Sequence, residues 1–252
     1  CLYYKNLAFE FVPVNPTDPR EIAFTRQPQV PVLQIGDEWR TDSTPLAIWL
    51  DELFPEKPLF GSTEQERESI LALDSWVTDS LILAGFRSAY EGEMSAKFRH
   101  IAWRLASIVS SQTPLPDEIR NAWPDLLKTA PFIKHMMCDV DASESLSEMQ
   151  ARIPLQLIEN LQGGPFFGGL TEPSLVDFAI FPQVVFNYMV GMDQLLGLTL
   201  EPSLNNWLNN MKPLLPRNPL LVPDFMIISP LVQDSEAQAG RSAQSTSVWG
   251  GS

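Results

Sequence analysis

The sequence predicts a fold in two parts, a small α/β lobe followed by an all-α domain. Over residues 1–60, short runs that alternate apolar and polar residues are separated by turn clusters and end in a helical segment, as in mixed α/β structure. From Ser62 onward the apolar residues recur at helical spacing, and Pro55, Pro58 and Gly61 separate the two patterns. We therefore expect an α/β lobe over 1–60, an α-helical domain over 62–232 and a disordered tail over 233–252.

Within the lobe, Leu2–Asn6 has the character of a helix end, and Ala8–Val14 alternates as a half-buried strand does. A turn cluster and a short helical stretch at Arg20–Thr25 come next. The following run predicts a hairpin and then a helix start with a proline in its first turn. Its segments are a strand at Val30–Ile35, a turn at Gly36-Asp37, a returning strand at Glu38–Thr41 and a helix from Asp42-Ser43-Thr44-Pro45.

The α-helical domain is expected to begin at a capping box in which Ser62 is the N-cap and Gln65 stands three residues later. Leu175–Met192 is strongly apolar, but Asp177, Pro182, Gln183 and Asn187 interrupt it, so it predicts a buried core helix and not a membrane span. The expected helices are Thr63–Glu91, Ser95–Ser110, Pro116–Lys128, Ser145–Gln162, Ser174–Met192 and Pro202–Met211.

The composition excludes several classes of protein. With 44% apolar and 19% charged residues, the 252-residue chain has the composition of a folded globular protein. Its 17 basic and 31 acidic residues give a net charge of −14, the wrong sign for binding nucleic acid or an anionic membrane. Two cysteines and two histidines, without a Cys/His cluster, predict no disulfide scaffold and no metal site. We expect a cytoplasmic protein without a signal peptide.

Pro31 lies inside an otherwise good strand, where proline removes a ladder donor. One interpretation is an edge strand. The other is a cis peptide bond after Val30, which would turn the backbone N–H and C=O of Val30 outward toward an extended peptide ligand.

Asp42-Ser43 precedes a predicted helix, where free N–H groups and the helix dipole favour an anion. The pair suits a zwitterionic amino-acid head group, because Ser43 can donate to a carboxylate while Asp42 holds an ammonium. The alternative is simple capping, which is the commoner role of Asp or Ser at this position.

The run Val30-Pro31-Val32-Leu33, the hairpin and Asp42-Ser43-Thr44-Pro45-Leu46-Ala47-Ile48-Trp49-Leu50 together resemble the glutathione-binding half of the cytosolic glutathione S-transferases. The resemblance implies a thioredoxin-like lobe in which the proline is cis. It also implies that Val30 and Pro31 bind the cysteinyl part of glutathione, and that Asp42 and Ser43 bind its γ-glutamyl end.

A second motif agrees with this resemblance. Gly164-Pro165-Phe166-Phe167-Gly168-Gly169, followed by Ser174 and Asp177, is similar to the signature of the family's carboxy-terminal domain. There Ser174 and Asp177 would form a structural capping box that starts a buried helix. Asn206–Met211 also resembles the last helix of such proteins, so the resemblance extends over about Cys1–Met211.

The chain departs from the family pattern at its start, because Cys1–Asn6 resembles the later part of the first helix of a thioredoxin-like lobe. We therefore expect the first strand and the loop with the catalytic residue to be absent from this sequence, and the catalytic residue is unknown. Four residues at helical spacing are candidates for a pocket for the second substrate, although such a stripe is more often core. They are Trp76, Asp79, Leu83 and Phe86.

The resemblance implies an enzyme that conjugates the thiolate of glutathione to a small, apolar electrophile, as in detoxification, and that forms a homodimer. The same lobe supports glutathione-dependent reduction, isomerisation or ether cleavage with another catalytic residue. The alternative is a non-catalytic binding or scaffold protein, since a fold alone does not prove activity.

Overall fold

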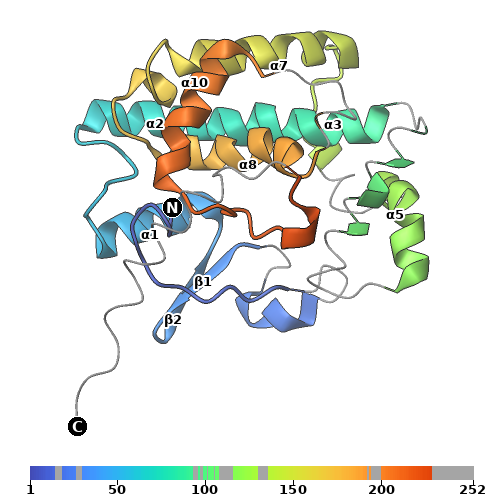
Figure 1. Ribbon diagram of the computed structural model, residues 1–252, viewed down its shortest axis with the longest axis horizontal. Helices are drawn as coiled ribbons and strands as arrows, with labels where there is room; N and C mark the ends of the chain where they lie inside the picture. The colour runs from blue at the N-terminus through green and yellow to red at the C-terminus, as the bar shows by residue number, and fades with distance from the viewer. Residues whose placement is uncertain are drawn as a thin grey trace.

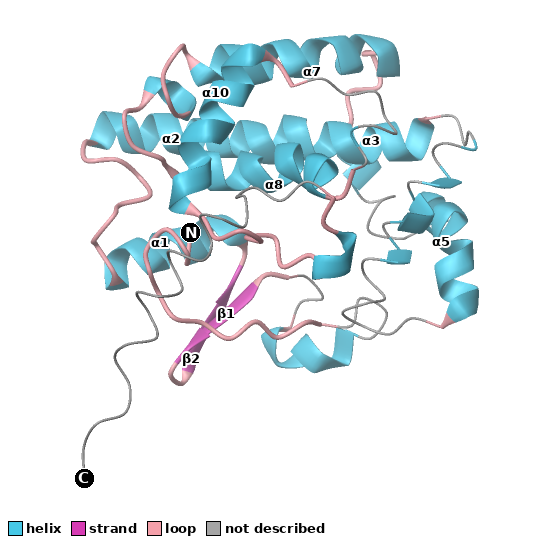
Figure 2. Cartoon of the chain, in the orientation of Figure 1, coloured by secondary structure: helices cyan, strands magenta, loops and turns pink. Residues whose placement is uncertain are grey.

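The computed structural model describes residues 1–14, 19–26, 30–92, 96, 99–100, 102–104, 106–107, 116–129, 136–191, 193 and 200–228. The predicted tail over 233–252 and most of the predicted helix Ser95–Ser110 lie outside the described residues, although the described positions between 96 and 107 are helical. Helices predominate in the described chain, and the sheet in it is a two-stranded one (Figure 2).

The α/β lobe contains the predicted hairpin. Strand β1 (Val32–Ile35) pairs antiparallel with β2 (Glu38–Thr41), with Val32 opposite Thr41. Gly36 in the connecting turn has φ +60°, a conformation that glycine adopts without steric cost. A 3₁₀ segment, η1 (Pro19–Thr25), precedes the hairpin, and α1 (Ser43–Leu53) follows it, both as the sequence predicts.

The start of the chain is partly as predicted. Leu2–Asn6 is the end of a helical turn: the N–H of Leu7 donates to the carbonyl of Leu2, the N–H of Asn6 donates to that of Tyr3, and Asn6 has φ +56°. These are the bonds of a Schellman motif. The predicted strand at Ala8–Val14 is wrong: the segment joins no ladder of the described sheet, and Phe11 and Val12 are 51% and 68% exposed. Alternation makes a strand only where a neighbouring strand supplies hydrogen bonds.

The α-helical domain begins with one long continuous helix, formed by α2 (Glu64–Trp76), a π-helical segment (Val77–Ile82) and α3 (Leu83–Glu91). Its N-cap is Thr63 and not Ser62: Thr63 accepts from the N–H of Glu66, and the carboxylate of Glu66 accepts from the N–H groups of Ser62 and Thr63. The predicted box is therefore shifted by one residue, because Glu66 is a stronger acceptor than the amide of Gln65.

The remaining helices agree with the prediction within three residues at their ends. In Figure 1, α7 lies on one side of the α2–α3 helix and α8 lies on the other, toward the lobe; α7 packs against α3, and α8 packs against α2. Their bounds are α5 (Asp117–Thr129), α7 (Leu146–Leu161), α8 (Leu175–Met189) and α10 (Pro202–Met211), with 3₁₀ turns at Met137–Asp139, Phe167–Gly169, Lys212–Leu214 and Asp224–Met226.

The helical stretch Glu64–Ser88, with a mean hydropathy of 1.3, is long and apolar enough to span a membrane, judged by length and composition alone. In this fold it packs against α7 and α8 as the central helix of the domain. Core helices of globular domains meet the same criterion, so the stretch is weak support for a membrane location. The Leu175–Met192 run forms α8, which is shorter.

One hydrophobic core joins the two parts of the chain. Trp207 of α10, Ile180 of α8 and Ile70 of α2 are almost completely buried in it. The same cluster takes in residues of the lobe and of the connection after α1, namely Tyr4, Ala47, Leu59 and Phe60. The position of α1 is therefore set by packing against the α-helical domain.

The motif before α8 is built around the buried carboxylate of Asp177. One oxygen accepts from the N–H of Phe167 (3.1 Å) and the indole N–H of Trp207 (2.8 Å), and the other accepts from the N–H (2.8 Å) and hydroxyl (3.2 Å) of Ser174. Burial raises the pKa of Asp177, and these four bonds oppose the shift. Gly164 is required in the same motif, because a Cβ there would lie 2.6 Å from the Cα of Gly169.

We expect Asp177→Ala to lower the free energy of unfolding by at least about 3 kcal/mol, because four buried donors lose their acceptor. Urea denaturation followed by tryptophan fluorescence measures the loss. The matched control is Glu148→Ala, which removes the equivalent carboxylate from the exposed capping box of α7. Equal losses in the two variants would show that the donors at Asp177 contribute nothing beyond an ordinary cap.

Candidate functional site

The start of α1 exposes uncapped backbone donors. Asp42 is the N-cap residue, with φ 70° and ψ 133°, and its side chain makes no capping bond. The N–H of Leu46 donates to the carbonyl of Asp42 (3.0 Å), and Pro45 has no N–H. The N–H groups of Ser43 and Thr44 therefore have no acceptor within the helix and lie at the positive end of its dipole. Such an end binds an anionic group, and Asp42 and Ser43 are both exposed beside it.

The hairpin brings the two predicted glutathione-binding motifs together. The peptide bond between Val30 and Pro31 is cis, and Val30 is 62% exposed. Both residues come just before β1, and Asp42 comes just after β2. Because the ladder ends with Val32 opposite Thr41, Pro31 and Asp42 lie at the same end of the hairpin. The four residues Val30, Pro31, Asp42 and Ser43 thus flank one end of the hairpin, and we call them the hairpin-end site.

A second acidic group, next to Asp42 of this site, is absent from the sequence prediction. The hydroxyl of Thr44 donates to the Oδ2 atom of Asp74 in α2 (2.5 Å), and Asp74 is buried. Burial raises the pKa of Asp74, the bond from Thr44 lowers it, and the negative charge of Asp42 raises it further. The sequence carries a signal for this residue: Ile70, Asp74 and Val77 share a buried face at i, i+4 and i+7, where an acidic residue is unusual.

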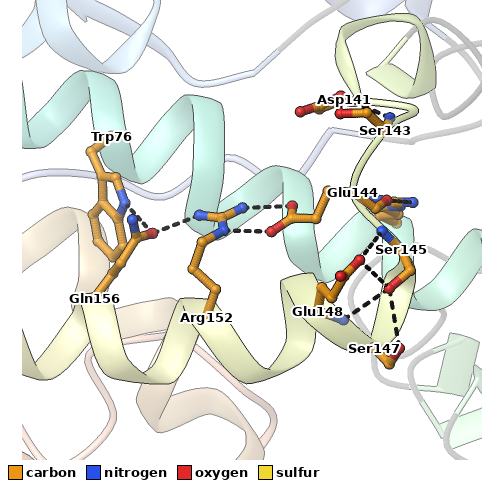
Figure 3. A network of polar contacts seen from close by, with 10 residues as sticks. Trp76, Asp141, Ser143, Glu144, Ser145, Ser147, Glu148, Arg152 and Gln156 are labelled. Atoms are coloured by element: carbon orange, nitrogen blue, oxygen red, sulfur yellow. Dashed lines mark hydrogen bonds and ion pairs between the residues drawn. The ribbon is translucent and has the colours of Figure 1, made fainter.

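The residues predicted to line a second pocket lie farther along the same long helix. The indole N–H of Trp76 donates to Gln156 of α7 (3.2 Å), which also accepts from Arg152, and Arg152 forms a bidentate pair with Glu144 (Figure 3). Trp76 therefore points toward α7, which lies across the α2–α3 helix from the lobe (Figure 1). Of the others, Asp79 is exposed, and Leu83 and Phe86 are partly buried. Their assignment to a pocket stays a prediction.

Metal chemistry receives no support from side-chain clustering in the described part of the chain. Within it, no three or more His, Cys, Asp or Glu side chains gather in a way that could hold a metal ion. The polar groups of the hairpin-end site are backbone N–H groups, the hydroxyl of Ser43 and the carboxylate of Asp42, which suit an organic zwitterion.

The lobe carries a cis-proline hairpin and an open helix start, and it packs on an α-helical domain with a buried Ser/Asp box, as the resemblance to the glutathione S-transferases implies. Comparison with known proteins gives a match to the same family over part of the chain. Residues 1–58 match the family described as "Glutathione S-transferase, N-terminal domain".

The fold has a counterpart among solved structures, the beta-etherase LigF from Sphingobium sp. strain SYK-6. The TM-score is 0.54 at 19% sequence identity, and the match covers 84% of this chain and 87% of that one. This likeness establishes the fold, while the N-terminal match supports the family. The predicted fold class, a thioredoxin-like lobe followed by an α-helical domain of the glutathione-transferase type, is thereby confirmed.

We expect Asp74→Asn to be at least as stable as the wild-type chain at pH 7. Because the folded state raises the pKa of Asp74 above its ordinary 3.8, stability falls as the pH rises from that value through the raised pKa. Asparagine stays neutral and keeps an oxygen that can accept from Thr44. Thermal unfolding of both chains between pH 3 and pH 8 tests this, and the advantage of the variant should disappear below about pH 4. A variant that is less stable at pH 7 would show that the charged carboxylate stabilises the fold.

Proposed function

We propose that the chain binds glutathione at the hairpin-end site and acts as a glutathione-transferase-like enzyme. The observation that carries the proposal is that Asp42 leaves the N–H groups of Ser43 and Thr44 uncapped, at the end of the hairpin that holds the cis Val30–Pro31 bond. The match of residues 1–58 to the glutathione S-transferase family supports the same ligand.

In this proposal each part of the tripeptide has a partner. The γ-glutamyl carboxylate accepts from the N–H groups of Ser43 and Thr44 and from the hydroxyl of Ser43, while Asp42 faces the ammonium. The backbone N–H and C=O of Val30 pair with the cysteinyl residue, as an edge strand pairs with an extended peptide. These contacts would hold the thiol in a fixed position relative to the second substrate. An enzyme accelerates a bimolecular reaction in part by holding the two reactants in this way.

The proposed reaction is nucleophilic substitution by the bound thiolate. A bond forms between the glutathione sulfur and an electrophilic carbon, and the bond from that carbon to its leaving group breaks, with the electron pair going to the leaving group. Conjugation and ether cleavage differ only in the leaving group, which in an ether is an alkoxide or phenoxide that then takes a proton. Because the fold resembles that of a protein named as a beta-etherase, ethers belong among the substrates to be tested.

The second substrate is proposed to be small and apolar and to bind near Asp79, Leu83 and Phe86 on the long helix. The group that lowers the thiol pKa from about 8.5 is not assigned to any residue of this chain. As the family resemblance implies, we also propose a cytoplasmic homodimer, for which light scattering during gel filtration gives the mass.

We expect reduced glutathione to bind with a Kd between about 1 μM and a few millimolar, measured by titration calorimetry at pH 7. Ser43→Ala and Asp42→Asn should each weaken binding about tenfold or more, because each removes a charge-assisted contact. Ser69→Ala, on the exposed face of α2, is the control and should bind as the wild-type chain does. Unchanged affinity for glutathione in both site variants would show that glutathione does not bind at the hairpin-end site.

An assay of product formation distinguishes an enzyme from a protein that only binds glutathione. The wild-type chain is incubated with reduced glutathione and a panel of aryl halides and aryl ethers, and the thioether products are measured by mass spectrometry. Product formation that Ser43→Ala lowers supports the enzyme. Binding of glutathione without turnover of any compound would favour a non-catalytic binding or scaffold protein.

A further inference from the structure

We propose, on the basis of the proposed function, that a chain of polar side chains on α7 positions the second-substrate part of the long helix. The members of this chain, which we call the α7 polar chain, are Gln156, Arg152 and Glu144 (Figure 3). They hold the long helix in the register in which Val77–Ile82 is π-helical, and thereby place Phe86 on the helix face that carries Asp74.

The π-helical segment Val77–Ile82 changes which residues of the long helix share a face. A π-helical turn is closed by i→i+5 hydrogen bonds, so it contains one residue more than an α-helical turn. Because an α-helix turns by about 100° per residue, the residues after the segment are rotated by about 100° from where an unbroken α-helix would place them.

The contacts of the long helix with α7 depend on this rotation. Before the segment, the indole N–H of Trp76 donates to Gln156 of α7 (3.2 Å). After it, Ala84 is buried in one cluster with apolar residues of α7, and the hydroxyl of Ser88 accepts from a glutamine of α7 (3.3 Å). In an unbroken α-helix Ala84 and Ser88 would lie about 80° and about 120° around the axis from Trp76, whereas the π-helical segment brings both within about 20° of it. The three residues therefore face α7 together only in the π register.

The α7 polar chain holds the long helix on both sides of the π-helical segment. Before the segment, Gln156 accepts from Trp76 and also from the guanidinium of Arg152 (2.7 Å), and Arg152 forms two bonds to the carboxylate of Glu144 (Figure 3). After the segment, the buried guanidinium of Arg87 donates to the backbone carbonyl of Glu144 (2.7 Å). Trp76 and Arg87 are thus connected through one set of residues, which fixes the rotation between the two halves of the helix.

This rotation determines which residue of α3 lies in line with the hairpin-end site. Thr44 of α1 donates to Asp74, so Asp74 marks the face of the long helix that is turned toward the lobe. In an unbroken α-helix Phe86 would lie about 120° around the axis from Asp74, but in the π register it lies within about 20°. Loss of the register would move Phe86 off this face. The hairpin-end site is joined to α2, before the segment, and would stay in place.

The structural test compares Gln156→Met with Gln156→Glu by hydrogen–deuterium exchange and mass spectrometry. Methionine keeps the length of the side chain but removes the acceptor, whereas glutamate keeps an acceptor for both the indole and the guanidinium. In Gln156→Met, amide exchange over 77–91 should become about tenfold faster, because a lost hydrogen bond lowers the free energy of local opening by about that factor. Exchange over 64–75 should not change, and Gln156→Glu should behave as the wild-type chain does.

The functional test measures turnover of a nitroaryl chloride with reduced glutathione at pH 7. In Gln156→Met the KM for the aryl chloride should rise about fivefold or more, because Phe86 is displaced, while the Kd of glutathione changes less than about twofold. Gln156→Glu should restore the KM. The matched control, Gln65→Met, makes the same substitution at an exposed position of α2 and should leave exchange, KM and Kd unchanged. Circular dichroism and thermal unfolding confirm that the variants are folded.

Unchanged exchange over 77–91 in Gln156→Met would overturn the proposal. Equally fast exchange in Gln156→Glu would also overturn it, since the side chain would then act through its packing and not as an acceptor. Equal losses of affinity for glutathione and for the aryl chloride would show that the chain supports the whole fold and not the second-substrate part. A wild-type chain that neither binds glutathione nor converts the aryl chloride would overturn the proposed function, whereas the exchange data would still decide whether the α7 polar chain sets the register.

Discussion

The carboxylate of Asp177 is the interaction on which the arrangement of the two parts depends. It holds the loop at Phe167, the first turn of α8 and Trp207 of α10 together, so α10 meets the loop and the helix start at one buried acceptor. The N–H of Leu175, at the start of the same helix, donates to the carbonyl of Leu59 in the connection after α1 (2.8 Å). The buried box therefore determines where the chain of the lobe passes, and through it where α1 lies.

A second polar cluster fixes the other end of α1. The ammonium of Lys5 is fully buried, pairs with Asp51 and donates to the carbonyl of Phe54 (2.7 Å), directly after the helix. A cation at a helix C-terminus satisfies free carbonyls and interacts favourably with the dipole. Asp51 also accepts from the N–H of Leu59, so the helix end and the connection to the α-helical domain share one acceptor. With its C-terminus closed in this way, α1 presents its open N-terminus from a rigid support.

Local patterns predict most of the fold and part of the site. Alternation and turn residues locate the hairpin, and the Ser/Asp spacing locates the start of α8. The alternation at Ala8–Val14 misleads because strand pairing depends on a partner that the segment itself does not specify. Asp74 is missed for a related reason: its role depends on the bond from Thr44, and a contact between residues so far apart is created by the packing of α2 beside α1. The spacing of apolar residues within α2 indicates only that the position of Asp74 is buried.

Under the proposed function, an acidic chain would bind the carboxylate of its ligand next to acidic groups of its own. With a net charge of −14, the chain repels an anion at long range, and Asp42 and Asp74 make the local potential at α1 still more negative. Two uncapped N–H groups alone would compete poorly with that repulsion. A ligand that brings its own cation removes the conflict, because its ammonium neutralises the acids whose charge would otherwise oppose its carboxylate. Under the proposed function, the acids that make the start of α1 a poor site for an anion would therefore make it a selective site for a zwitterion.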